Sequence, residues 1–290
     1  MSYRRWAEAI VWAKYDLKIL GCSALTSFLS SADLILGLTA LRVESGDPGF
    51  ESLNFIARRI LRIFPLYWIV ILFPLTRWLR SNDLFGFSFA DSWFLLPCLA
   101  YPRIRLITGQ AWTLIFEMIF YYVMTVFLRL SIRYAVRNTI VALVLLVVAG
   151  QFVGFSRPGL LIVMNPILLE FVMGAITALA FHRFGRVRMA GFTMLVAGVL
   201  AVGLLTFYVR TNVALLQNVL RGVNLLPRVV SWGIAAWMLV SGVVFWGPHV
   251  RSRLSKLLVE VGNGSYSIYL TSAIATEIIS RLMLTFRQVP

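Results

Sequence analysis

Charged residues are scarce in this chain of 290 residues. Asp, Glu, Lys and Arg together make up 13% of the sequence, whereas hydrophobic residues make up 60%. A soluble domain needs more polar surface, since about a quarter of an ordinary globular chain is charged. The mean hydropathy of +0.84 and the long apolar runs exclude a soluble enzyme, a disordered chain, a coiled coil and a disulfide scaffold. We therefore expect an all-α fold, a polytopic bundle of transmembrane helices.

Histidine and cysteine are almost absent. The two histidines, His182 and His249, stand beside expected loops, and the two cysteines, Cys22 and Cys98, match no metal or redox spacing. Because a structural or catalytic metal ion needs several such ligands close together, we predict no metal site. The cysteines are expected to be packing residues.

Positive charge is concentrated between the apolar runs. Lys and Arg number 27 against 12 Asp and Glu, which gives a net charge of +15. In a soluble protein this excess would point to nucleic acid, but arginines that flank apolar runs are typical of membrane topology. We therefore predict anionic lipid headgroups, and no nucleic acid, as partners of these arginines.

Apolar runs long enough to cross a membrane predict about eight spans. Six runs are clear, a seventh at 265–286 is more polar, and an eighth at 17–41 is interrupted by charged residues. The run 84–101 contains an acid and a proline and is predicted to be an interfacial or re-entrant segment. The six clear runs are 63–79, 111–130, 139–155, 160–181, 189–209 and 229–246.

Arginine counting orients the bundle. If 84–101 does not cross the membrane, four short loops with most of the basic residues lie on one side, which we expect to be cytoplasmic. These loops carry Arg42, Arg58, Arg59, Arg62, Arg129, Arg133, Arg137, Arg183, Arg186, Arg188, Arg251, Arg253 and Lys256.

An arginine pair precedes the apolar run 63–79. Arg59 and Arg62 are three residues apart and lie on one face of a helix. Two interpretations stay open. A positive-inside anchor, followed by an aromatic belt of Tyr67 and Trp68, needs only the charge. A clamp for phosphate groups needs the planar fork of the guanidinium.

Acidic side chains interrupt the apolar runs. Glu117 lies inside the run 111–130, where a charged side chain costs about 3 kcal/mol even on insertion scales. Glu170 and Glu277 occupy similar positions. Such an acid is a candidate for function, but a structural ion pair with an arginine at the membrane edge explains it equally well.

Four motifs follow one another along the chain. Arg-Ile-Leu-Arg-Ile-Phe-Pro-Leu-Tyr-Trp at 59–68 and Trp-Thr-Leu-Ile-Phe-Glu-Met-Ile-Phe-Tyr at 112–121 come first. Leu-Glu-Phe-Val-Met-Gly at 169–174 and Gly-Asn-Gly-Ser-Tyr-Ser-Ile-Tyr-Leu at 262–270 come next. In this order they resemble the acyltransferase type 3 family of integral membrane O-acyltransferases, especially the branch that acts on bacterial exopolysaccharides.

The resemblance implies a bundle of about ten helices in the bacterial inner membrane. It implies transfer of an acyl group from acetyl-CoA or another acyl-CoA to a hydroxyl of a polysaccharide or lipid-linked glycan, without a metal. Arg59 and Arg62 would bind the donor phosphates, while Glu117 and Tyr121 would be catalytic. The residues that would support or line the cavity are Trp112, Glu170, Ser265, Tyr266 and Tyr269. From the residues alone, Ser265 is better explained as a helix cap.

The first 42 residues depart from the family pattern. Family members begin with a helix that carries an essential histidine, whereas this chain has no histidine before His182. We expect 1–42 to be an atypical segment, truncated or out of frame, ahead of an acyltransferase-like region at 43–290. The alternative function is a non-catalytic family fragment or a polysaccharide-export or transport component.

We predict that this chain alone does not catalyse acyl transfer. A sugar hydroxyl needs a positioned base, and the family's histidine is missing, so that only a membrane acid such as Glu117 could replace it. Polysaccharide acetylation is measured in cells that lack the native enzyme, with this chain and with a version carrying a family-type N-terminal helix pair. Acetylation by the unmodified chain would refute the prediction.

Overall fold

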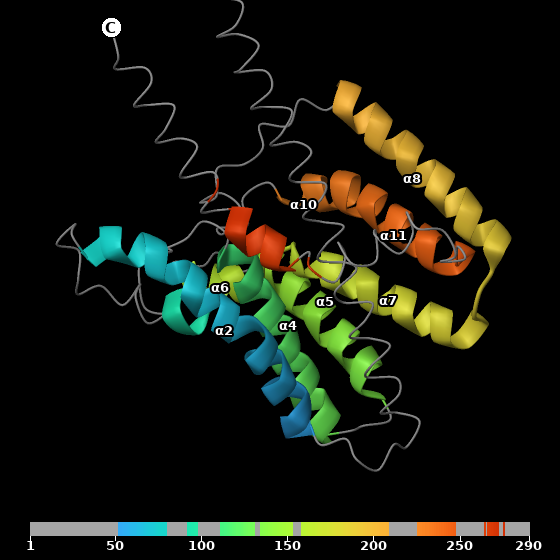
Figure 1. The fold of residues 1–290 in the computed structure, drawn as a ribbon. Coiled ribbons are helices and arrows are strands. Elements are labelled where there is room, and N and C mark those ends of the chain that lie inside the picture. The colour runs from blue at the N-terminus through green and yellow to red at the C-terminus, as the bar shows by residue number, and fades with distance from the viewer. Residues whose placement is uncertain are drawn as a thin grey trace, which may run out of the picture. The chain divides into compact units, whose positions relative to one another are not determined.

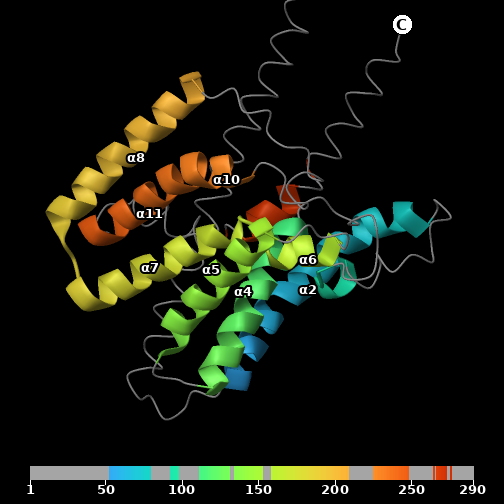
Figure 2. The ribbon, with the colours of Figure 1, turned by 180° about the vertical axis from the view of Figure 1, so that it is seen from behind.

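The protein is built from helices, as the apolar runs predict. In the computed structural model the described residues are nearly all helical, and no strand occurs among them (Figures 1 and 2). The expected all-α fold is confirmed. The structure describes residues 52–79, 92–97, 111–130, 134–152, 158–208, 225–247, 264, 266–272 and 275. The predicted weak span at 17–41, the atypical segment at 1–42, Ser265 and Glu277 lie outside them.

Five helical stretches of the described residues are long and apolar enough to cross a membrane. They coincide with five of the six clear apolar runs, as expected for a polytopic membrane protein. The remaining run, 63–79, is helical within α2 (Ser52–Leu79) but is not one of these five. The five stretches are Ala111–Leu130, Ala135–Phe152, Gly159–Phe184, Arg188–Phe207 and Leu225–Trp246.

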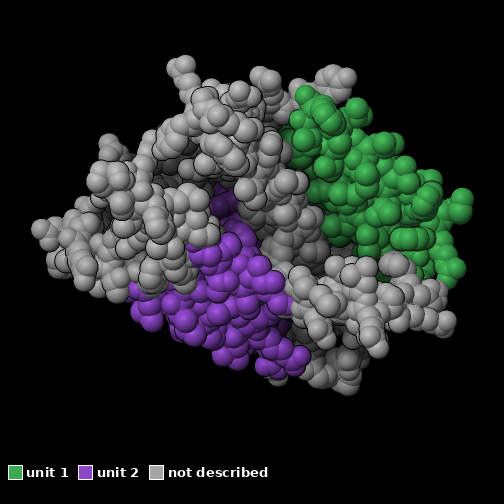
Figure 3. All heavy atoms as spheres, turned by 45° about the horizontal axis from the view of Figure 1, so that its top comes forward, with its two compact units in different colours: residues 1–49, 126–154, 164–248 green, residues 50–125, 155–163, 249–290 purple. Residues whose placement is uncertain are grey.

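The chain divides into two compact units, coloured separately in Figure 3. Unit 1 contains α5 (Ala135–Phe152), α7 (Leu168–Phe184), α8 (Arg188–Tyr208), α10 (Leu225–Arg228), η2 (Val229–Gly233) and α11 (Ile234–Trp246). Unit 2 contains α2, α4 (Ala111–Leu130) as far as Thr125, α6 (Pro158–Val163) and the helical residues 266–272.

In unit 1, α11 packs against both α7 and α8, and the three helices lie side by side in Figures 1 and 2. Between α7 and α11, the hydroxyl groups of Thr177 and Ser241 share a hydrogen bond of 2.7 Å. The indole N–H of Trp237 donates to the Thr177 hydroxyl at 2.7 Å. Such bonds help helices to associate where the surrounding lipid supplies no hydrophobic driving force between them.

The run predicted at 160–181 lies within one candidate span, Gly159–Phe184, but the helix is interrupted inside it. Asn165 and Pro166 separate α6 from α7. Proline lacks an N–H and disfavours helical geometry in the residue before it, so that the helix stops here. The Asn165 side-chain oxygen accepts the N–H of Ile167 at 3.0 Å. The backbone carbonyl of Asn165 accepts the N–H of Leu168, the first residue of α7, also at 3.0 Å. This turn sets where α7 begins.

The predicted run at 229–246 starts earlier, at α10, and contains a π-helical turn, η2. The N–H of Ile234 bonds to the carbonyl of Val229, five residues back. The Ser231 hydroxyl donates to the carbonyls of Pro227 at 2.7 Å and Arg228 at 3.3 Å. It thereby competes for carbonyls that an α-helix gives to its own N–H groups.

In unit 2, two aromatic residues of α2 hold part of the run 84–101. The Tyr67 hydroxyl donates to the carbonyl of Ser92, and the Trp68 indole N–H donates to the carbonyl of Trp93 at 3.1 Å. The rings of Trp68 and Trp93 also stack, with centroids 5.9 Å apart. Since Tyr67 is fully buried, its interpretation as part of an aromatic belt is wrong. Its hydroxyl group instead binds the backbone at Ser92, in the run 84–101.

The helices α8 and α11 of unit 1 approach each other closely at a glycine seam formed by Gly191, Gly198 and Gly242. A Cβ atom on Gly242 would lie 2.6 Å from the backbone nitrogen of Leu195. On Gly191 it would lie 2.2 Å from the backbone nitrogen of Trp246, and on Gly198 it would lie 3.0 Å from a leucine of α11. Backbone atoms cannot turn aside as side chains do, so that the seam requires small residues.

We predict that Gly242→Ala destabilises the protein by about 1–3 kcal/mol, because its methyl group pushes α8 and α11 apart. The control is Gly203→Ala in α8, where an added Cβ meets nothing within 4 Å. That variant should be neutral or gain up to about 1 kcal/mol from helix propensity. Unfolding of the purified proteins in detergent measures both. Equal stability of Gly242→Ala and the wild type would contradict the seam.

Candidate functional site

Glu117 and Tyr121 form a buried pair on α4. Their spacing places both side chains on one face of the helix. The Tyr121 hydroxyl donates a hydrogen bond to Glu117 Oε1. Glu117 is 7% exposed and Tyr121 is 2% exposed. A charged group in an apolar helix is costly unless it finds a partner, and Tyr121 supplies a donor from the same helix.

Arg59 brings positive charge to this pair. Its guanidinium carbon lies 5.8 Å from the centre of the Tyr121 ring and 5.6 Å from the centre of the Phe55 ring. Both contacts have cation–π geometry. The Phe55 and Tyr121 rings meet edge to face at 6.2 Å. Tyr121 therefore contacts the acid through its hydroxyl group and the cation through its ring.

The two arginines of the first motif differ in their surroundings. Arg59 is half-buried and Arg62 is exposed. Both guanidinium groups attract the Glu117 carboxylate electrostatically. Two cations facing one carboxylate leave an excess of positive charge, which suits an anionic ligand. A topology anchor needs charge alone and does not require the ring contacts of Arg59.

Tyr266 and Tyr269 connect the helical residues 266–272 to the other helices of unit 2. The Tyr266 hydroxyl donates to the carbonyl of Ile63 in α2 at 2.9 Å. The Tyr269 hydroxyl accepts a hydrogen bond from Thr113 Oγ1 in α4 at 3.1 Å. Tyr266 is also close enough to the buried acid of α4 for an electrostatic interaction. Through these bonds both tyrosines hold the helical residues 266–272 against α2 and α4. Their predicted role in lining a cavity stays a prediction.

The other predicted site residues belong to different parts of the chain. Trp112 is half-buried at the start of α4, where its ring meets that of Phe116 edge to face at 6.0 Å. Glu170 belongs to unit 1, where it forms an ion pair with Arg228. Ser265 lies outside the described residues. Within the described part of the chain, no three His, Cys, Asp or Glu side chains are grouped so as to hold a metal ion.

Sequence reasoning does not single out Phe55 or Arg228. Phe55 precedes the first motif and has no chemical signature of its own. Arg228 directly precedes an apolar run, and arginines in that position are ordinarily topology signals. The available signal was indirect: a buried acid such as Glu170 needs a cation, and Arg228 stands at the edge of another span.

Comparisons with known proteins identify the family. A family model described as an acyltransferase domain matches residues 28–288, which contain all four motifs. The exopolysaccharide production protein ExoZ of Rhizobium meliloti (strain 1021) is 31% identical over 235 residues, covering 79% of this chain and 69% of ExoZ. No solved structure matches the chain significantly. The extent of the family match and the identity to ExoZ show that the chain belongs to the acyltransferase type 3 family.

Proposed function

We propose that this protein, when it is completed by a family-type N-terminal helix pair, transfers an acetyl or other acyl group from an acyl-CoA to a hydroxyl of an exopolysaccharide or related cell-envelope glycan, in the bacterial inner membrane. Family membership supports acyl transfer, and a relative named for exopolysaccharide production supports the acceptor. The observation that carries the proposal is the contact of Tyr121 with both Glu117 and Arg59. It joins a group that can accept a proton to a group that can hold a phosphate.

The donor would bind at the arginine pair. Coenzyme A carries several phosphate oxygens, and a guanidinium group binds two of them at once in a planar fork. Arg62 is exposed and available for such a ligand, while Arg59 is positioned by Phe55 and Tyr121. The positive-inside rule places this end of α2 in the cytoplasm, which is where acyl-CoA is found.

Glu117 would assist the transfer itself. The sugar hydroxyl oxygen attacks the thioester carbonyl, the C–S bond breaks, and coenzyme A leaves as its thiol. A base must take the hydroxyl proton and pass one on to the leaving sulfur. The Glu117 carboxylate can do this in a site that excludes water, and the bond from Tyr121 holds it in one orientation. Tyr121 is in that case a positioning residue.

We predict that replacing Arg59 and Arg62 together by Lys weakens acetyl-CoA binding about tenfold or more. Lysine keeps the positive charge but loses the bidentate fork. Arg58→Lys, at an exposed arginine next to the pair, is the matched control and should bind normally. The dissociation constant is measured with purified protein in nanodiscs. Unchanged affinity in the double variant would leave the pair as a topology anchor only.

We predict that Glu117→Gln abolishes polysaccharide acylation while the protein still inserts in the membrane and binds acetyl-CoA. Glutamine keeps the shape and can still accept the Tyr121 hydrogen bond, but it cannot act as the base. The O-acetyl content of the polysaccharide is measured for the version that carries a family-type N-terminal helix pair. An active Gln variant would reduce Glu117 to a packing and hydrogen-bonding residue.

A further inference from the structure

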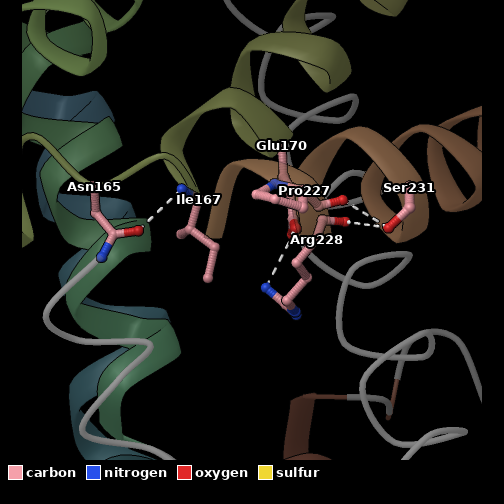
Figure 4. Close-up of polar contacts among 6 residues, drawn as sticks. All are labelled: Asn165, Ile167, Glu170, Pro227, Arg228 and Ser231. Carbon is pink, nitrogen blue, oxygen red and sulfur yellow. Dashed lines mark hydrogen bonds and ion pairs between the residues drawn. The ribbon is translucent and has the colours of Figure 1, made fainter. Parts of the chain in front are cut away.

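The ion pair between Glu170 and Arg228 is a second buried charged site, and the proposed reaction gives it no task. Glu170 Oε1 lies 3.6 Å from Arg228 Nη1. Figure 4 shows the two side chains pointing toward each other. The Glu170 side chain is 1% exposed and that of Arg228 is 12% exposed. Arg228 is the partner nearer the protein surface, while its Nη1 and both carboxylate oxygens of Glu170 are enclosed.

Polar atoms of this pair are left without hydrogen-bond partners within the described part of the chain. They are both carboxylate oxygens of Glu170 and Nη1 of Arg228. Their separation suits an ion pair but is too long for a hydrogen bond. Buried polar groups are nearly always hydrogen-bonded, and unmet charged groups are the most costly. The site thus presents two acceptors and one donor to a further group.

The chemistry of these atoms selects a neutral hydroxyl. The two opposite charges cancel, and the pair has no net charge. Glu170 repels an anion such as phosphate, and Arg228 repels a cation. A hydroxyl group donates one hydrogen bond and accepts up to two. It can therefore donate to the Glu170 carboxylate and accept from the Arg228 guanidinium at the same time. A sugar ring presents several such groups side by side.

Gly233 in the π-helical turn η2 lies next to the carboxylate of Glu170. A Cβ atom at Gly233 would lie 3.5 Å from Glu170 Oε1 and 3.4 Å from Met173 Cε. These are ordinary van der Waals distances, so that packing alone does not require glycine here, in contrast to the glycine seam. The absent side chain leaves room next to Oε1. Turns of π-helix are frequent at functional sites.

The pair lies at one particular end of unit 1. Successive contacts along α7 and the run α10–α11 show that they are parallel, because Glu170 meets Arg228 and Phe181 meets Phe245. Both helices therefore start at the end of the ion pair. The arginine-rich connection at 184–188 lies at the opposite end and is cytoplasmic by the positive-inside rule. The ion pair then faces the other side of the membrane, where an exported glycan is found.

We propose that Glu170 and Arg228 form a binding subsite for sugar hydroxyl groups of the acceptor glycan on the non-cytoplasmic side of the membrane. This inference rests on the proposed function for the identity of the acceptor. The pair binds and selects the glycan and takes no part in the proton transfer. Its two charges discriminate against phosphorylated or cationic ligands, and its unmet donor and acceptors favour an uncharged sugar ring.

The test measures glycan binding without turnover. The probe is a set of tritium-labelled oligosaccharides hydrolysed from the exopolysaccharide of a strain that lacks this protein. Wild type, Glu170→Met/Arg228→Met, Gly233→Ala and the control Gly203→Ala are compared in nanodiscs. Methionine roughly preserves side-chain volume, and replacement of a whole buried ion pair by apolar residues is often neutral for stability. Acetyl-CoA affinity and unfolding temperature are measured on the same samples.

We expect the double variant to raise the dissociation constant for the oligosaccharides at least about tenfold. Gly233→Ala should raise it severalfold, since its methyl group occupies the space beside Oε1. Gly203→Ala should bind the oligosaccharides with wild-type affinity, and acetyl-CoA affinity should be unchanged in every variant. If the double variant does not fold, Gly233→Ala decides, because the added methyl group makes only ordinary contacts.

Two results would overturn the subsite. One is wild-type oligosaccharide affinity in the folded double variant. If the double variant does not fold, the corresponding result is wild-type affinity in Gly233→Ala. Either result would show that the ion pair is purely structural. The other is a wild-type protein that binds acetyl-CoA but none of the oligosaccharides, which leaves the donor half of the proposed function intact. Pair-dependent oligosaccharide binding without acetyl-CoA binding would support the subsite and contradict the proposed function.

Discussion

A carboxylate inside an apolar helix must find a partner, and the structure of both units is organised around that requirement. Glu117 is met by a hydroxyl from its own helix and by the charge of arginines on α2. Glu170 is met by Arg228, which comes from a different span. The hydroxyl group of Tyr121 is a local partner and stays in place as long as α4 is helical. The ion pair of Glu170 depends on the correct packing of two segments distant in sequence.

Interruptions of regular helix place the polar groups of unit 1. At the turn of Asn165 and Pro166, the buried Asn165 side-chain oxygen accepts the N–H of Ile167, and α7 starts just ahead of Glu170. The π-helical turn η2 fixes the position of Arg228, the partner of Glu170. It follows Arg228 directly and brings Gly233 next to the carboxylate. Irregular backbone is tolerated at membrane depth only where it is buried in protein or lines a polar space.

Local information in the sequence predicts much of this protein. Apolar runs indicate the spans, because the length and hydropathy of a span do not depend on its neighbours. The buried pair on α4 is likewise predictable, since a spacing of four residues already puts Glu117 and Tyr121 on one helix face. The break at Asn165 is signalled by the proline that follows, but uninterrupted hydropathy from α6 to α7 conceals it.

Contacts between distant segments could not be derived in the same way. The order of residues does not determine that Arg59 contacts the Tyr121 ring, or that Arg228 is the cation that faces Glu170. Both depend on how helices pack, and a single sequence contains no direct record of that. The function of an arginine at a membrane edge is therefore undetermined until its neighbours are known, since topology, ligand binding and ion pairing all use the same residue in the same place.

The glycine seam gives α8 two faces with different packing constraints. Most of its apolar surface is open to the surroundings, and only 11% of the span is buried inside the protein. On that outer face one apolar residue serves as well as another, so that substitutions can accumulate as lipid composition changes. At Gly191 and Gly242 no side chain is accommodated. The outer surface of α8 can therefore change in composition without disturbing the ion pair and hydroxyl contacts between α7 and the run α10–α11.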